Sequence, residues 1–483
     1  MSQSVDLGWY PPNNTSINNL TAVLNDANGV YGFIFDTSDT SIEQYGTYNW
    51  CNMPHVRKTE YVKPSAEYEL RYVEVIQRHH KRTPYASNAF PVEPYHWNCD
   101  DQGLYYYGEP LSSDKQAAEA YWQGYISSVN PFSPSGWIGT CQFPQITAGG
   151  LDDSWVHGQD LYGVYHDLLG FLPARDEDWR SKVTYRVTQN VITSQVAGML
   201  INGMWLTTDP VPLTIQGVGV DSLEPQYSCS VGNDLFNNIK SSSNVAWQNH
   251  LDAATDLFGT LDDISGVPST DSGFHASFDH YYDNLSARQC HAKPLPCKLV
   301  DGVKSITCVD QTLADAVYRM GQWEYSQIYR DARSSLAASA TSYGVWIAEL
   351  SAHLRDAMAG EPGPIYFHNV AHDGSVSRLL SVLQADVMVW PGMGSEVVFE
   401  LYRRSNMATP TSTSNSEVST PTSSSESGYY VRVLFGGQKL RSSNPSLGLI
   451  DMLSVETLLA YFDGLAGINA SLVVGKCNGT IPT

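Results

Sequence analysis

Basic residues and long apolar stretches are both scarce in this chain. Its 483 residues include 28 lysines and arginines against 50 aspartates and glutamates, which gives a formal net charge of −22. So acidic a surface would repel nucleic acids and anionic membranes, and we expect neither as a partner. No apolar run approaches the roughly 20 residues that a membrane-spanning helix needs. The composition therefore favours a soluble globular protein.

Signatures of metal ions and nucleotides are missing as well. The chain contains neither a His-Glu-x-x-His motif nor a Gly-rich nucleotide-binding loop, and no two cysteines stand in Cys-x-x-Cys spacing. Histidines such as His275 and His280 lack the spacing of metal ligands. We therefore expect no metal site and no cofactor.

The cysteines that are present number eight and are widely scattered, which favours four disulfide bonds formed in an oxidising compartment. Asn-x-Ser/Thr sequons favour the same compartment, although chance also produces such triplets in a chain rich in these residues. The first residues lack the features of a signal peptide, so we expect a secreted or cell-wall protein whose leader has been removed. The cysteines are Cys51, Cys99, Cys141, Cys229, Cys290, Cys297, Cys308 and Cys477, and the sequon asparagines are Asn13, Asn14, Asn19, Asn284, Asn469 and Asn478.

One short segment carries most of the chemistry that the sequence offers. Residues 78–84 read Arg-His-His-Lys-Arg-Thr-Pro and follow residues 72–77, which have the pattern of a buried strand. Guanidinium groups bind phosphate oxygens in a planar fork and stay charged at any working pH, so Arg78 and Arg82 would seat a phosphoryl group. An imidazole beside them can attack phosphorus and form a covalent intermediate. His79 is therefore the candidate nucleophile.

A second segment lies far downstream, where residues 365–373 read as a strand that ends in His372 and Asp373. The first segment resembles the Arg-His-Gly-x-Arg-x-Pro signature of the histidine acid phosphatases, and the second resembles that family's strand ending in His-Asp. A weaker match, residues 186–188, resembles the place where the family supplies another phosphate-binding arginine. Matching segments extend from about residue 72 to about residue 465. The chain is thus similar to this family over most of its length.

The resemblance implies a role for each matching residue. His79 would be the nucleophile, while Arg78, Arg82, Arg186 and His372 would bind the phosphate. Arg186 could equally be a strand arginine that faces solvent, and His372 could be an ordinary loop histidine.

The resemblance also implies that Asp373 is the general acid, which protonates the leaving alkoxide. An aspartate just before a helix is otherwise a common N-cap, which is the structural alternative for this residue. A bound phosphate dianion would favour the protonated carboxyl, and this coupling, together with titration of the substrate, would give an acidic pH optimum.

Two positions depart from the family pattern. His80 stands where the family has glycine, a residue usually required where backbone approaches a ligand or adopts a positive φ. This histidine could change the loop, add an imidazole to the pocket or abolish activity. With Lys81, it is a possible substrate-pocket residue. Ile192 stands where the family often has a second arginine, and we assign it no role.

Alternating strand and helix patterns predict an α/β fold with a mostly parallel sheet flanked by helices, and the resemblance implies a phosphoglycerate-mutase-like fold. We expect residues 1–208 and 360–483 to form this catalytic domain, and residues 209–359 to form an inserted, mainly α-helical domain. Residues 1–70 would wrap the surface. The Ser/Thr-rich residues 408–428 cannot supply a core and should be disordered.

Finer patterns predict individual elements. Apolar residues at three- and four-residue spacing indicate helices over residues 235–261 and 313–359, separated by a connector rich in Pro, Gly and Cys over residues 266–308. Alternating apolar residues over 396–403 and 429–435 predict a β-hairpin.

The sequence as a whole predicts a secreted acid phosphatase of fungal origin that hydrolyses small phosphomonoesters through a phosphohistidine at His79. A phytase, which hydrolyses inositol hexakisphosphate, is one alternative, but it would need a wide cationic cleft that the acidic composition disfavours. A catalytically inactive secreted relative that binds phosphate or phosphorylated ligands is the other. His80 is the residue that keeps this last alternative open.

Overall fold

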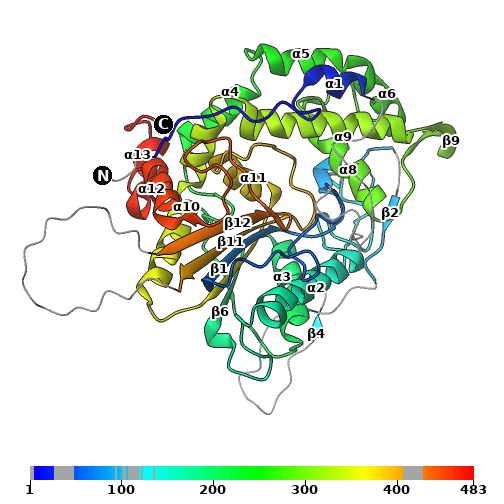
Figure 1. The fold of residues 1–483 in the computed structure, drawn as a ribbon. Helices are drawn as coiled ribbons and strands as arrows, with labels where there is room; N and C mark the ends of the chain where they lie inside the picture. Colours follow the sequence, from blue (N-terminus) through cyan, green and yellow to red (C-terminus); the bar gives the residue numbers. More distant parts are fainter. Residues whose placement is uncertain are drawn as a thin grey trace, which may run out of the picture.

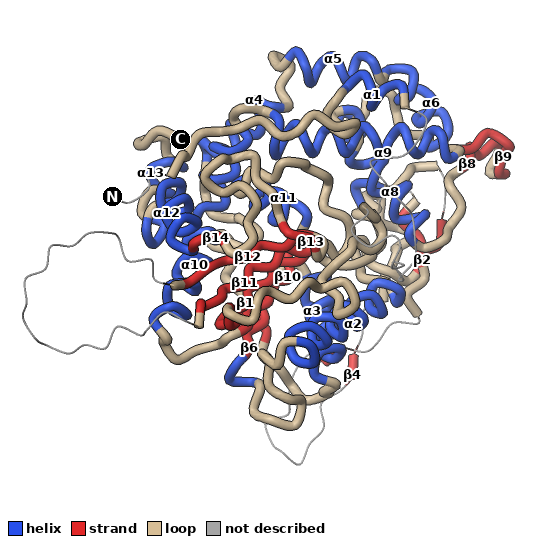
Figure 2. The backbone as a smooth tube through the Cα atoms, in the orientation of Figure 1, coloured by secondary structure: helices blue, strands red, loops and turns tan. Residues whose placement is uncertain are grey.

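The computed structural model shows one central sheet with helices packed on both of its faces (Figures 1 and 2). The predicted α/β class is confirmed. The structure describes residues 5–26, 48–92, 95–100, 105–106, 119–120, 123–133, 136–405 and 428–483.

The central sheet has eight strands in the order β13-β12-β11-β1-β10-β6-β7, with β14 beside β12. Strands β1, β10, β6 and β7 run parallel to one another, and this half of the sheet carries both sequence motifs. Strands β11 and β12 pair antiparallel, as their alternation of apolar residues predicts. The strands are β1 (Tyr68–Arg78), β6 (Val183–Val187), β7 (Leu213–Thr214), β10 (Tyr366–Ala371), β11 (Glu396–Arg404), β12 (Tyr429–Phe435), β13 (Gln438–Lys439) and β14 (Leu453–Ser454).

Strand β1 is buried on both faces because its apolar residues are nearly consecutive and point alternately to the two faces of the sheet. Tyr72 and Ile76 pack with apolar residues of α10, α11 and α12, whereas Val73 and Val75 pack with those of α2 and α3 on the other face. The sheet is therefore held between two layers of helices, which fixes the position of the strand ends. These helices are α2 (Ala148–Tyr162), α3 (Val191–Trp205), α10 (Ser335–Ala359), α11 (Asp373–Val382) and α12 (Val455–Ala466).

Residues 209–359 are mainly helical, as their apolar spacing predicts. The expected connector over residues 266–308 is only partly irregular, because it contains α8 (Asp279–Cys290), most of whose side chains are buried. Helix α10 packs against α11, α12 and β1. The division into two domains stays a prediction. The other described helices here are α4 (Ser230–Ile239), α5 (Val245–Ala253), α6 (Thr255–Ser265), α7 (Ser272–His275), α9 (Gln311–Ser326) and η5 (Gln327–Asp331).

Shorter elements complete the described part of the chain. Among them, α1 lies near α5 and α6, away from the sheet (Figure 2). They are α1 (Leu20–Asn25), η2 (Ala86–Asn88), η3 (Gly163–Leu168), η4 (Arg180–Lys182), η6 (Ile468–Ala470), α13 (Val473–Cys477), β2 (Tyr95–Trp97), β3 (Tyr105–Tyr106), β4 (Glu119–Ala120), β5 (Trp137–Gly139), β8 (Cys297–Val300) and β9 (Val303–Cys308).

Four disulfide bonds join all eight cysteines, as their even number predicts. The predicted surface-wrapping segment is described only in part, and the predicted disordered segment lies outside the described residues except for Gly428. Among the helices described, none combines the length and apolarity needed to cross a bilayer. The bonded pairs are Cys51–Cys290, Cys99–Cys141, Cys229–Cys477 and Cys297–Cys308.

Candidate active site

The two sequence motifs meet at the carboxyl ends of neighbouring parallel strands. Arg78, the last residue of β1, is in register with Ala371, the last residue of β10. The backbone N–H of His79 donates to the Ala371 carbonyl at 3.0 Å. The imidazole rings of His79 and His372 lie edge to face with centroids 5.5 Å apart. Carboxyl ends of parallel strands are the usual ligand-binding edge of an open α/β sheet.

The His79 ring is held in one orientation and one tautomer. Its Nδ1 donates to the His80 carbonyl at 2.9 Å, so Nε2 carries the free lone pair. Nε2 has no hydrogen-bond partner among the described residues. Burial, followed by the positive charges of Arg82 and Arg78, holds the pKa of this imidazole well below its usual value. Burial and both charges therefore favour the neutral, nucleophilic form of the ring.

Arg78 has a buried guanidinium group, and only some of its N–H donors have partners within the described part of the protein. Its Nη1 donates to the Pro391 carbonyl at 2.5 Å, and its Nη2 lies 3.1 Å from Oδ2 of Asp373. The group also lies over the indole of Trp50, 4.7 Å from the ring centroid. Its Nε is buried, and no described residue provides it with an acceptor. A buried donor without an acceptor is costly, and an anionic ligand that accepted from this N–H would remove that cost.

Arg82 is also fixed by contacts to its guanidinium group, one of them from Asp283 on α8. Its Nη1 donates to the Thr83 carbonyl and to Oδ1 of Asp283, both at 2.9 Å. Its guanidinium stacks on Tyr85, with 4.3 Å between the guanidinium carbon and the ring centroid. As in Arg78, its Nε is buried and has no acceptor among the described residues. Two rigid guanidinium groups with open donors therefore flank the His79 imidazole.

Asp373 is the first residue of α11, while His372 occupies the N-cap position. Oδ1 of Asp373 accepts from the N–H of Gly374 at 2.8 Å, and Oδ2 of Asp373 accepts from Nε1 of Trp390 at 2.8 Å. Burial alone would raise the pKa of this carboxyl, but Arg78, the Trp390 hydrogen bond and Arg82 together lower it. Without a ligand, Asp373 is therefore a carboxylate.

The His372 ring bonds to groups from two other segments. Its Nε2 lies 2.9 Å from the Thr188 hydroxyl and 3.3 Å from Oε2 of Glu224. Glu224 also acts electrostatically on Asp373, and its side chain is 38% exposed. A carboxylate at this position would oppose the binding of additional negative charge.

Arg186, the weakest of the three matches, has an acidic partner at each Nη atom, while its Nε is buried and no described residue provides it with an acceptor. Its Nη1 lies 2.8 Å from Oε2 of Glu349, and its Nη2 lies 3.3 Å from Oδ1 of Asp221 and donates to Ser222 at 2.9 Å. The residue pairs in register with Asn369, below the end of β10. A phosphate role for Arg186 stays a prediction, since its charge is already met by two carboxylates.

His80 and Lys81, expected as possible pocket residues, turn into the protein interior. Nζ of Lys81 lies 2.9 Å from Oδ2 of Asp153, and both side chains are buried. Nε2 of His80 lies 3.2 Å from Nδ1 of His157. The imidazole of His80 also sits against Gly394, where an added Cβ would come within 2.4 Å of it at a φ of +72°.

The His80 ring thus begins a buried chain of hydrogen bonds. Nε2 of His157 lies 2.9 Å from Oε2 of Glu396, whose Oε1 accepts from the N–H of Val56 at 2.7 Å. Burial lowers the pKa of both imidazoles, so both are neutral, and one ring donates to the other. The His80 carbonyl accepts from Nδ1 of His79. The hydrogen bonds that hold the His80 ring therefore also help to hold the candidate nucleophile in place.

His80 and His157 are expected to be energetically coupled. In His157→Ala the His80 ring loses its partner, and we expect unfolding free energy to fall by about 1–3 kcal/mol, the cost of an unpaired buried polar group. In a His80→Gly background the same substitution should cost less. A double-mutant cycle by denaturant unfolding measures the difference, and strictly additive losses would contradict the coupling.

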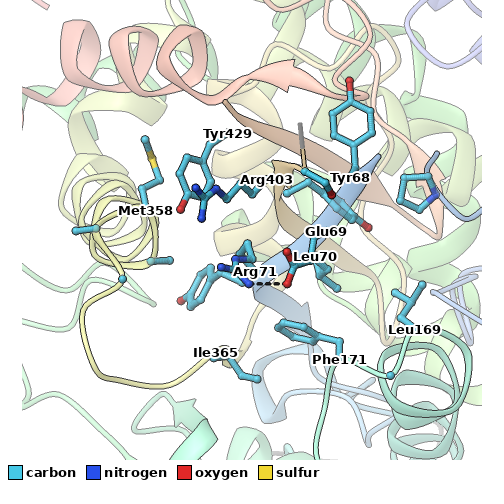
Figure 3. A pocket seen from close by; sticks show the side chains of 18 of the residues that line it. Tyr68, Glu69, Leu70, Arg71, Leu169, Phe171, Met358, Ile365, Arg403 and Tyr429 are labelled. Carbon is cyan, nitrogen blue, oxygen red and sulfur yellow. Dashed lines mark hydrogen bonds and ion pairs between the residues drawn. The ribbon is translucent and has the colours of Figure 1, made fainter. Parts of the chain in front are cut away.

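A cavity of about 1140 Å³ lies at the opposite end of β1 (Figure 3). Met358, Phe171 and Tyr429 contribute to its walls, and Figure 3 shows the ion pair of Arg71 and Glu69 within it. None of the predicted site residues lines it. Strand β1 runs from this cavity to His79, a distance of roughly 25 Å at about 3.3 Å per residue.

Several residues of the site were not identified from the sequence. Asp283, Glu224 and Trp390 contact Arg82, His372 and Asp373 from segments that no motif marks. Thr188 was part of the third match, but no role was given to it. The pattern of strands and helices in the sequence does not specify which side chains from other segments contact the strand ends.

Comparison with known proteins gives matches among solved structures only. No family model matches the chain, and no curated protein sequence matches it. The phytase of Hafnia alvei in complex with tartrate is 11% identical over 83% of this chain and 98% of its own, with a TM-score of 0.51. The phytase of Citrobacter braakii is 12% identical over 78% of this chain and 86% of its own, with a TM-score of 0.47. The Hafnia alvei match shows a shared fold.

Proposed function

We propose that this chain is a histidine acid phosphatase, which hydrolyses phosphomonoesters through a phosphohistidine at His79. The observation that carries the proposal is the position of His79 beside Arg78 and Arg82: among the described residues, neither its Nε2 nor the Nε donors of the two arginines have a hydrogen-bond partner. Asp373, bonded to one of those arginines, supplies a carboxyl group at the same strand edge. The two sequence motifs and the fold shared with a phytase support the same assignment.

The reaction proceeds in two displacements. Nε2 of His79 attacks phosphorus in line, the bond from phosphorus to the alcohol oxygen breaks, and the leaving oxygen takes a proton from Asp373. Water then attacks the phosphohistidine and gives its proton to the Asp373 carboxylate. The phosphorus–nitrogen bond breaks, and inorganic phosphate leaves. Arg78 and Arg82 stabilise the charge that gathers on the phosphoryl oxygens in both steps.

The proton for the leaving group arrives with the substrate. Asp373 is ionised in the free protein, because its neighbours lower its pKa. A phosphomonoester monoanion retains one proton up to a pKa near 6 and brings it into the site. Transfer of this proton to Asp373 produces the acid and the bound dianion together. The productive pair of enzyme and substrate therefore becomes rare as pH rises above that value.

We expect kcat/KM to fall by about tenfold per pH unit above roughly pH 6, where the substrate loses its proton. On the acid side, activity should persist well below pH 6.5, because the lowered pKa of His79 keeps its imidazole neutral. Initial rates at low substrate concentration between pH 3 and 8 measure both limbs. A value that stays constant up to pH 8, or that falls as pH drops below 6.5, would contradict this assignment.

The charges of the site favour esters that carry a single phosphate over inositol hexakisphosphate. Arg82 and Arg186 each have a carboxylate partner, and Glu224 adds an acidic group beside His372. The testing experiment compares phosphate release from 4-nitrophenyl phosphate, glycerol 2-phosphate and inositol hexakisphosphate. We expect the first two to be hydrolysed and the third to be a poor substrate. A strong preference for the hexakisphosphate would assign a phytase, and no release from any of the three would favour an inactive relative.

We also propose that the protein is secreted, as four disulfide bonds would suit an oxidising compartment. The sequon asparagine Asn284 is buried and bonds to Arg288 and to the Asn88 carbonyl, so a glycan there would not fit the fold. The other sequon asparagines are exposed.

A further inference from the structure

A cavity of about 420 Å³ lies among α4, α9, η5 and α11. Phe236 of α4, Tyr325 of α9, Tyr329 of η5 and Arg378 of α11 contribute to its walls. In Figure 1, α4, α9 and α11 lie above the central sheet. Neither sequence motif contributes a residue to this cavity.

The inner wall of the cavity is built on the residues that hold the candidate general acid. The ring of Tyr325 stacks on Trp390 with centroids 3.9 Å apart, and Trp390 donates to Asp373. Arg378 donates to the carbonyl of Gly374, the residue next to Asp373, at 2.9 Å. Tyr325 and Tyr329 also interact electrostatically with Asp373, so the cavity wall lies next to the residues that surround this carboxyl.

The walls offer aromatic faces with a few polar groups. The rings of Phe236 and Tyr329 have centroids 5.4 Å apart, and the guanidinium of Arg378 lies 5.1 Å from the first and 5.8 Å from the second. The hydroxyls of Tyr325 and Tyr329 have no hydrogen-bond partner within the described part of the chain. Such walls can stack on a planar ring and bond to its polar substituents.

The charges of the cavity balance. Lys240 and Arg378 contribute two positive groups, and Asp279 and Glu324 contribute two negative ones. Glu324 is buried and bonds to His250, so it stays within the wall. A leaving group with several phosphates would meet no surplus of cations here. An uncharged ring needs no surplus of cations to bind here.

We propose that this cavity binds the leaving group and that the substrates are phosphomonoesters of aromatic alcohols without a second phosphate. The inference rests on the proposed phosphatase function. Phe236 is a specificity-determining residue in this account, because its ring lines the cavity beside Tyr329 and Arg378.

The test compares 1-naphthyl phosphate with glycerol 2-phosphate in the wild type, Phe236→Ala, Phe236→Leu and Phe132→Ala. Phe236→Leu keeps an apolar side chain at a buried position, so it separates loss of the ring from loss of folding. Phe132 is 90% exposed and lies outside the cavity, so Phe132→Ala controls for loss of an aromatic ring at the surface. Thermal unfolding of each variant checks that the fold is retained.

We expect kcat/KM for the naphthyl ester to fall by roughly three- to tenfold in both Phe236 variants, the scale of one aromatic pair. The glycerol ester and the Phe132 control should be unchanged. Equal losses for both esters, or no loss for either, would overturn the inference.

A binding measurement separates this inference from the proposed function. Quenching of tryptophan fluorescence by 1-naphthyl phosphate is followed in His79→Ala, which cannot turn the ester over. Weaker binding when Phe236→Leu is added supports the cavity even if the wild type hydrolyses neither ester. Unchanged or absent binding would overturn the inference independently of turnover.

Discussion

His79→Ala is expected to lower kcat/KM for aryl and alkyl phosphates by on the order of 10⁴-fold or more, the scale seen when a covalent catalyst loses its nucleophile. The reason is geometric, because no other described nucleophile combines a free lone pair with the two arginine donors. Steady-state release of phosphate at acidic pH measures the effect. Retention of more than about one part in a hundred of the wild-type rate would rule out a covalent role at this residue.

Two controls keep this result interpretable. Phosphate binding to His79→Ala should be retained, because Arg78 and Arg82 do not depend on the imidazole for their positions. His79→Asn preserves a polar side chain at the same buried position and should be equally inactive. Loss of phosphate binding in both variants would indicate a collapsed site rather than a missing nucleophile.

Asp373→Asn is expected to lower kcat/KM, which reports only the first displacement, by roughly 10²- to 10⁴-fold for glycerol 2-phosphate, which needs a proton on its leaving oxygen. The loss should be much smaller for 4-nitrophenyl phosphate, since nitrophenolate leaves without protonation. The ratio of the two losses is the diagnostic quantity. It distinguishes proton transfer from a purely structural contribution of the Arg78 ion pair.

Equal losses with both esters would show that Asp373 positions Arg78 and donates no proton. Trp390→Phe offers a matched comparison, because it removes the indole N–H that bonds to Asp373 while keeping an aromatic ring. Without that hydrogen bond the pKa of Asp373 should rise, since the bond contributes to lowering it. The alkaline limb of kcat in this variant should therefore move to higher pH.

The sequence predicted the parts of the site that lie on strand ends. Strand β1 has an unambiguous pattern and ends at Arg78, and β10 ends just before His372. Parallel pairing of two such strands brings their ends to one edge, so the meeting of His79 and Asp373 follows from the strand patterns and the resemblance.

Other features depend on contacts that no local pattern encodes. Asp283 lies on α8, in a segment whose prolines, glycines and cysteines predicted a connector, yet its carboxylate holds Arg82. The orientation of His80 depends on His157, on a distant helix, and on space left by Gly394. Because such partners are set by packing of whole elements, single-sequence patterns could not find them.

The most direct test of the central claim is capture of the phosphoryl group on the protein. The wild type is mixed with 4-nitrophenyl phosphate for milliseconds, denatured in alkali and digested, and the peptides are analysed by mass spectrometry. The account predicts one phosphorylated histidine, His79, that forms within the first turnover and is absent from His79→Ala. Turnover without any phosphohistidine, or phosphorylation at His80 or His372 instead, would contradict it.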